Sequence, residues 1–318
     1  MNWGIKMDKI KKLGEMKILP LLITMSIPAV ISMMVQAAYN IGDSIFLGQI
    51  SESSLISVSL ALPLQMILVS VSVGLGIGIS AVASRKLGEN KLDDVANVGA
   101  HGFVLGFILW ILVLIVGFTL PRPFFEMYTN DPVIIDQGVK YISIIMIFSL
   151  GRIMARVCAS FLQSTGDMVS SMKIQLTGAI TNIVMDPILI FGFLFIPGLG
   201  IGGAAIATSG AQFISLFVGL YLLRKNQVGS KVTLRKFKFD KKIAVPLSLI
   251  GVPAMVMKGL SSVMILSLTS IIGGITIVGV SVLGVDYILQ MLVFMSVFGL
   301  CQCIMPSIGY NCGAKYKK

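Results

Sequence analysis

Six long stretches of this sequence contain no Asp, Glu, Lys or Arg, and they constrain the fold more than any other feature. They cover residues 18–42, 53–84, 95–121, 187–223, 259–285 and 287–314. A helix crosses a bilayer with about 20 apolar residues, and every stretch is long enough. Charged residues make up 12% of the chain, whereas soluble domains contain roughly 25%. The sequence therefore predicts a polytopic helical membrane protein and excludes a soluble globular one.

Turn and breaker residues between the apolar runs divide the chain into about eight transmembrane helices. The all-α fold that we expect has helices near residues 18–47, 54–83, 97–120, 139–163, 172–196, 201–223, 243–271 and 276–308. Helix ends predicted in this way are good to a few residues.

The basic residues indicate how the helices are oriented. Eight bases lie between Arg224 and Lys242, whereas the connections 48–53, 197–200 and 273–276 contain none. Because cytoplasmic loops collect Lys and Arg, both chain ends should be cytoplasmic in a cell membrane, and no cleaved signal peptide is expected. The net charge of +11 reflects these loops and does not predict nucleic-acid binding, because no aromatic residues are interleaved with the bases.

The chain resembles itself when it is shifted by 225 residues. This shift aligns Pro28 with Pro253, Gly48 with Gly273, Gln65 with Gln290, Gly74 with Gly299, and Gly88 with Gly313. Internal repeats of this kind are typical of secondary transporters. We therefore divide the chain into an N-terminal segment (1–17), a six-helix first lobe (18–223), a basic linker (224–242) and two helices of a repeated second lobe (243–318).

Three acidic residues are predicted to lie inside the membrane, where an ionisable group is costly and marks a functional site. They are Asp43, Asp186 and Asp286. At 1.5 Å per residue, Asp43 should lie about 7 Å from the outer end of its helix and Asp186 roughly 15 Å from the end of its own. Asp286 is expected to line the cavity between the lobes.

Polar residues should gather around the first two carboxylates. Asn182 shares a helix face with Asp186, Thr208 reaches a similar depth, and Tyr141 begins the fourth helix. Oxygen ligands of this kind suit Na+, and two neighbouring carboxylates readily hold a proton. The alternative is that these residues only form hydrogen bonds between helices. We also expect Gln36, Tyr39 and Asn40 to line the substrate cavity.

Other residues within the spans have less specific roles. Pro28 and Pro253 permit helix bending. Arg152 and Arg156 could extend toward the cytoplasm or balance an acid. The cysteines and the single histidine have no spacing typical of a metal site or disulfide, and no nucleophile or phosphate-loop motif is present. We therefore expect neither an enzyme nor a bound cofactor.

Several motifs together resemble those of the multidrug and toxic compound extrusion (MATE) family of cation-coupled antiporters. They are YNIGDSIFLG (39–48), QSTGD (163–167), TNIVMDP (181–187), GIGGAAIAT (200–208) and GYNCGA (309–314). The resemblance implies that Asp43, Asn182, Asp186 and Thr208, with Tyr141 as a weaker match, form a site for H+ or Na+. It also implies twelve helices, so this chain would be truncated after its eighth.

The resulting prediction is an antiporter that exports organic cations by alternating access. Two alternatives stay open. One is a lipid-linked sugar flippase of the same superfamily, which would need a strongly cationic cavity. The other is a non-transporting remnant that pairs with a chain supplying four more helices.

Overall fold

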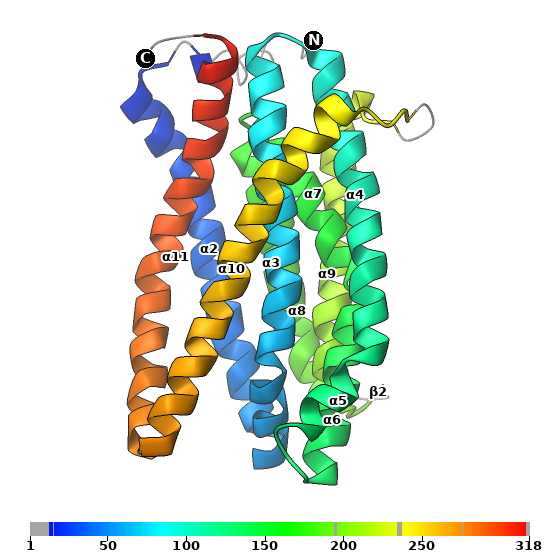
Figure 1. The fold of residues 1–318 in the computed structure, drawn as a ribbon, viewed down its shortest axis with the longest axis vertical. Coiled ribbons are helices and arrows are strands. Elements are labelled where there is room, and N and C mark those ends of the chain that lie inside the picture. The colour runs from blue at the N-terminus through cyan, green and yellow to red at the C-terminus, as the bar shows by residue number, and fades with distance from the viewer. Residues whose placement is uncertain (1–12, 15, 194–195, 234–236, 276, 316–318) are drawn as a thin grey trace.

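A computed structural model describes residues 13–14, 16–193, 196–233, 237–275 and 277–315. Within the described helices, some side chains lie outside the description, including those of Asn40 and Asp286. The chain forms an elongated bundle of helices (Figure 1).

In the described part of the chain, seven helices are long and apolar enough to cross a membrane, and a bent pair brings the number to eight if it is counted as one span. The seven are α2 (Ile18–Gly48), α3 (Glu52–Gly88), α4 (Leu92–Thr119), α8 (Met168–Phe191), α9 (Ile201–Lys225), α10 (Lys241–Ile275) and α11 (Ile277–Gly313). The bent pair is α6 (Pro132–Ile147) and α7 (Leu150–Ser164). The predicted all-α membrane fold with eight spans is confirmed.

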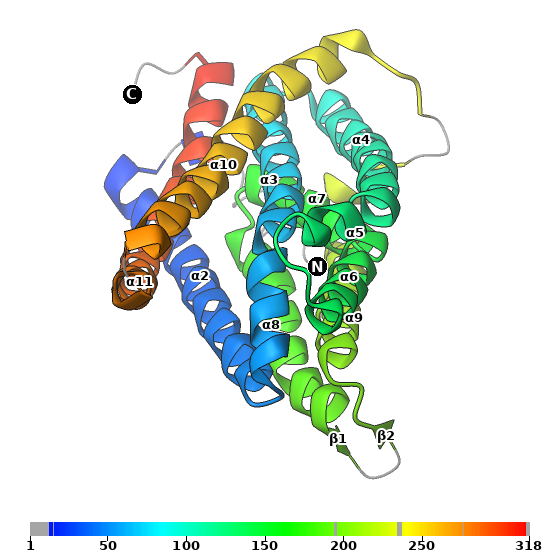
Figure 2. The ribbon, with the colours of Figure 1, turned by 60° about the horizontal axis from the view of Figure 1, so that its bottom comes forward.

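Short elements connect some of these spans. They are α5 (Pro121–Glu126), the strands β1 (Gly192–Phe193) and β2 (Ile196–Pro197), and the 3-10 turn η1 (Gly229–Lys231). The two strands pair in an antiparallel hairpin that projects beyond α8 and α9 (Figure 2). We call the end of the bundle with this hairpin the hairpin end. The opposite end, where α2 begins and α11 ends, is the terminal end.

Predicted helix ends differ from the structure by up to seven residues, and two differences alter the course of the chain. The fifth ends at Phe191 instead of 196, because Gly192 leaves the helix with a positive φ of 85° and opens the hairpin. The fourth is not continuous but bends by 44° between α6 and α7. The carbonyl of Ile147, at the end of α6, accepts a 3.0 Å hydrogen bond from the indole N–H of Trp110. This side-chain partner satisfies a backbone oxygen at the break, as helix ends inside a membrane require.

α3 runs through the middle of the bundle, and α10 crosses it obliquely (Figure 1). The crossing depends on glycines, since a Cβ on Gly74 would lie 2.7 Å from the carbonyl oxygen of Gly251 and 2.8 Å from the amide nitrogen of Met255. Small residues allow helix backbones to approach this closely in membranes. The first helix of the predicted second lobe is thereby packed tightly against the first lobe.

α11 joins the first lobe near the terminal end. The thiol of Cys303 donates to the carbonyl of Met25 in α2 over 3.1 Å, and the Gln163 amide of α7 donates to Gln302 over 3.1 Å. Both contacts join residues more than 100 positions apart in the sequence. The division of the chain into two lobes stays a prediction.

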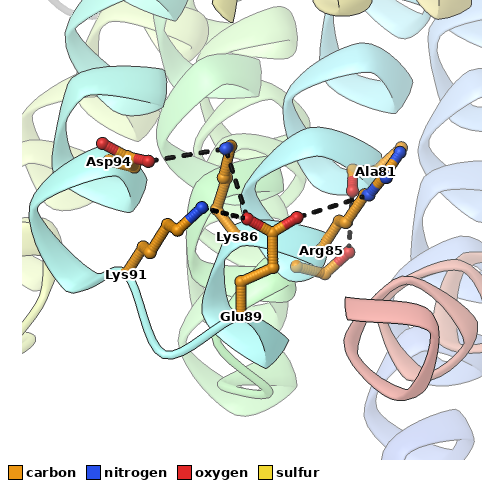
Figure 3. A network of polar contacts seen from close by, with 7 residues as sticks. Ala81, Arg85, Lys86, Glu89, Lys91 and Asp94 are labelled. Carbon is orange, nitrogen blue, oxygen red and sulfur yellow. Dashed lines mark hydrogen bonds and ion pairs between the residues drawn. The ribbon is translucent and has the colours of Figure 1, made fainter. Parts of the chain in front are cut away.

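Charged side chains form a network at the terminal end, where α3 turns into α4 (Figure 3). The Glu89 carboxylate contacts Lys91 at 3.0 Å and Lys86 at 3.3 Å, and Lys86 also contacts Asp94 at 3.4 Å. The hydrogen bond from Lys91, followed by that from Lys86, lowers the pKa of Glu89. The resulting stabilisation is present above the usual glutamate pKa and is lost as the pH falls through the lowered value.

The connection into α10 is attached to His101 of α4. The backbone N–H of Asp240 donates to His101 Nε2 over 2.9 Å, so the ring proton lies on Nδ1, which donates to the carbonyl of Asn97 over 2.8 Å. The ring also contacts Phe237 and Phe239, with centroids 4.8 Å and 5.8 Å away. His101 is 1% exposed, and this neutral tautomer satisfies both of its nitrogens.

We expect His101→Phe to release the segment that leads into α10. Phenylalanine keeps the ring contacts but leaves the Asp240 N–H without its acceptor, a loss of about 1–3 kcal/mol. Limited tryptic digestion should therefore cut faster after Lys231 and Lys238 than in the parent protein. Cleavage after the exposed Lys91, in the turn between α3 and α4, is the internal control. Equal rates at all three sites would show that the histidine does not hold the segment.

Candidate functional site

Two carboxylates from packed helices lie near the hairpin end of the bundle. Asp43 belongs to α2 and Asp186 to α8, and the two helices pack together. The carboxylates lie close enough to repel each other. Each is five residues from the end of its helix, or about 7.5 Å at 1.5 Å per residue. The prediction that Asp186 lies about twice as deep as Asp43 is wrong, because α8 ends earlier than expected.

Asp186 is held by residues of α8 and α9. Its Oδ1 accepts a 3.0 Å hydrogen bond from the side-chain amide of Asn182, and the same amide donates to the Thr208 hydroxyl over 3.4 Å. Asn182 and Asp186 are one helical turn apart, which puts both on the face of α8 that meets α9. Both are buried, at 3% and 1% exposed. The structure thus brings together three of the predicted site residues.

Several oxygen atoms of this site have no hydrogen-bond donor among the described residues. They are Oδ1 of Asp43, Oδ2 of Asp186 and Oδ1 of Asn182, and all three are buried. Buried polar atoms in proteins nearly always have a partner. Since all three atoms are acceptors and two belong to mutually repelling carboxylates, a proton or a cation is the partner that fits them.

Two tyrosines surround the carboxylates. The Tyr39 hydroxyl forms a hydrogen bond with the side chain of Gln36. The same hydroxyl lies within electrostatic range of Asp43, Asp186 and Arg152. Tyr141, which is 2% exposed, interacts with both carboxylates.

The Tyr141 hydroxyl accepts a 2.9 Å hydrogen bond from the amide of Gln65 in α3. Gln65 was not among the site residues predicted from the sequence. A polar amide inside the charge-free stretch 53–84 is a sequence feature that could have indicated a role at the site.

A small pocket lies beside the carboxylates, among α3, α6, α7 and α9. Its polar lining residues are Ser149, Arg152, Thr208, Ser209 and Gln212. Thr208 belongs both to this pocket and to the hydrogen-bond chain of Asp186. Ser149 lies in the break between α6 and α7. Its hydroxyl is buried and has no hydrogen-bond partner among the described residues.

The structure does not place the remaining predicted residues at the carboxylate site. The side chains of Asn40 and Asp286 lie outside the described residues. α2 and α10 continue through Pro28 and Pro253, so a bending role for these prolines stays a prediction.

The described residues contain no cluster of three or more His, Cys, Asp or Glu side chains, and the described cysteines are not paired. The oxygen donors of Asp43, Asp186, Asn182 and Thr208 nevertheless suit Na+.

The fold defines the chain as a polytopic helical membrane protein with buried carboxylates among its spans. The MatE family model matches residues 28–188, which cover all of the site except Thr208. The chain belongs to the MatE family. This is a family of transporters and not of enzymes.

Named relatives extend the match beyond that region. The multidrug export protein MepA of Staphylococcus saprophyticus is 27% identical over 288 residues, 90% of this chain and 63% of the relative. A FAD transporter of Shewanella oneidensis is 28% identical over 307 residues, 92% of this chain and 65% of the relative. The chain therefore spans less than two thirds of the length of these relatives.

Solved structures share the fold. A crystal structure of a MATE in complex with MaL6 matches with a TM-score of 0.86 at 26% identity, over 93% of this chain and 65% of that one. A transporter of the MOP superfamily from Pyrococcus furiosus, described as having a binding pocket of reverse polarity, matches with a TM-score of 0.85 at 25% identity over the same shares.

We expect the Tyr141 hydroxyl and the Gln65 amide to be energetically coupled. Tyr141→Phe leaves the buried amide without an acceptor, and Gln65→Leu leaves the hydroxyl without its donor. The double variant removes both partners and should be less destabilised than the sum of the single variants, by about 1 kcal/mol. Unfolding in mixed detergent micelles measures the three free energies. Additive losses would mean that this hydrogen bond does not position Tyr141.

Proposed function

We propose that this chain forms the cation-coupled part of an antiporter that exports small molecules across the cell membrane. The observation that carries the proposal is the set of unpartnered buried oxygens on Asp43, Asp186 and Asn182. A proton or Na+ bound there offsets the repulsion between the carboxylates, whereas the empty site leaves two charges uncompensated in a medium of low dielectric.

The arrangement of helices supports coupling to a conformational change. Asp43 lies on α2 and Asp186 on α8, so a shared cation draws these two helices together. α2 also contacts α11 through Met25 and Cys303. Movement of α2 on cation binding would therefore reach the helix of the predicted second lobe. Alternating access between two lobes requires such a link.

The charge distribution supports an orientation with both chain ends in the cytoplasm. Arg85, Lys86, Lys91 and Lys231 form their ion pairs at the terminal end, whereas Arg122 lies in the short α5 helix that follows α4. Bases collect on the cytoplasmic side of membrane proteins, so the carboxylates would lie near the outer surface.

We expect the carboxylates to bind the coupling ion directly. Infrared difference spectra of the purified protein should show a change in carboxylate bands when Na+ is added or when the pH is lowered. Which of the two conditions produces the change identifies the ion. The double variant Asp43→Asn, Asp186→Asn should lack this signal, while Asp136→Asn, an exposed acid, should retain it. An unaltered spectrum in the double variant would refute the proposed cation site.

We expect transport to depend on the same two residues. In proteoliposomes with an imposed Na+ or pH gradient, movement of the dyes ethidium and carboxyfluorescein should be compared for the parent, each single Asp→Asn variant and Asp136→Asn. Loss of one charged ligand should slow gradient-driven movement by at least about tenfold. Gradient-driven transport at the parent rate by Asp186→Asn would contradict coupling through this site.

A further inference from the structure

Two arginines lie inside the span that α6 and α7 form. Arg152 and Arg156 are one turn apart in α7, which ends at Ser164. At 1.5 Å per residue, they lie about 18 Å and 12 Å from that end. Arg152 therefore lies deeper along the helix than Arg156, and extension to the membrane surface stays a prediction that fits Arg156 better.

The Arg156 side chain is directed toward α3 and is held there. A Cβ on Gly76 would lie 2.9 Å from Arg156 Nε, so the absence of a side chain at Gly76 makes room for the guanidinium. Nε is buried and has no hydrogen-bond partner among the described residues. The buried hydroxyl of Ser160, one turn further along α7, also lacks one. Two possible donors thus lie side by side against α3 without an acceptor.

No acid balances either arginine within the described part of the chain. The ion pairs found there involve Arg85, Lys86, Lys91, Arg122 and Lys231, all outside the interior of the spans. The Arg152 guanidinium lies within electrostatic range of the Tyr39 hydroxyl and of the Arg156 guanidinium, which it repels. A guanidinium deep in a bilayer is normally paired, so this position calls for an anion.

A third base comes from the other side of the lobe boundary. Lys258 of α10 lies near enough to Arg156 for the two charges to repel each other, and its ammonium lies 4.0 Å from the ring centroid of Phe298 in α11. α10 packs on α3 directly beside Gly76, through Gly74 and Gly251. Bases of α7 and α10 therefore approach each other across α3.

We infer that Arg152, Arg156 and Lys258 bind the anionic group, a phosphate or carboxylate, of an amphipathic molecule. An anion between Arg156 and Lys258 offsets the repulsion between these two bases and supplies the acceptor that Arg156 Nε lacks among the described residues. The inference rests on the proposed transport function, for which it names the substrate class. It replaces the organic cations that the sequence analysis expected.

The membrane potential agrees with this substrate class. In a cell whose interior is negative, outward movement of an anion and inward movement of a cation both release about 2.3 kcal/mol per charge and 100 mV. Export of an organic cation would instead consume that energy.

Two dyes of similar size and opposite charge test the inference. Carboxyfluorescein and rhodamine 6G are titrated against the full chain in nanodiscs of phosphatidylcholine, and binding is followed by fluorescence anisotropy without an ion gradient. We expect carboxyfluorescein to bind. Arg152→Gln, Arg156→Gln and Lys258→Gln should each weaken its binding at least about tenfold, without weakening that of rhodamine 6G.

Matched variants separate loss of charge from loss of folding. Arg156→Lys keeps the charge and should keep most of the affinity, while Arg122→Gln removes an exposed base outside the site and should change nothing. The inference is overturned if carboxyfluorescein does not bind the parent protein, or if it binds the three Gln variants as tightly as the parent.

A lipid headgroup could supply the same anionic chemistry as a soluble substrate. Nanodiscs with added phosphatidylglycerol distinguish the two. Displacement of the dye from the parent protein by this lipid assigns the site to a lipid phosphate, whereas undiminished dye binding assigns it to a soluble anion. Because no gradient or carboxylate signal enters this assay, its failure is distinct from failure of the infrared test of Asp43 and Asp186.

Discussion

The cost of a charge in a low-dielectric medium determines how this chain is organised. Ion pairs of its described residues lie at the ends of spans, such as the network of Glu89 with Lys86 and Lys91. Polar groups within the spans are few, and each needs a partner from the protein or from a ligand. For that reason the unpartnered oxygens near Asp186 and the unpartnered nitrogen of Arg156 carry more functional information than the many satisfied groups around them.

The break between α6 and α7 gives this span two chemical environments. Tyr141, before the break, interacts with the carboxylates of α2 and α8. Arg152, after the break, lines the adjacent pocket together with Thr208. One span thus contacts both a site suited to a cation and a group of bases suited to an anion. The indole N–H of Trp110 stabilises the break because it donates a hydrogen bond to the carbonyl of Ile147. This contact adds no charge to the span.

The sequence was enough to predict the eight spans, because charge-free runs of membrane length have few alternative structures. It also predicted that Asp43 and Asp186 approach each other, since helix periodicity fixes the face on which Asn182 and Asp186 lie. The bend at Ser149 and the early end of α8 were not predictable, because apolar composition continues through both. A Gln or Arg inside an apolar span is visible in the sequence, but the contacts of Gln65 with Tyr141 and of Arg156 with Gly76 join different helices, and no local pattern encodes them.

Opposite charges at the two proposed sites restrict how exchange could work. A cation on Asp43 and Asp186 does not compete with an anion on Arg156 and Lys258 for the same atoms; direct electrostatics would favour having both bound at once. Antiport therefore requires the two ligands to stabilise different arrangements of the helices, by more than their mutual attraction. The anion draws α10 toward α7, whereas the cation draws α2 toward α8. Because α3 packs against both α10 and α7, a movement of α10 toward α7 would have to be accommodated at the close contact of Gly74 with Gly251.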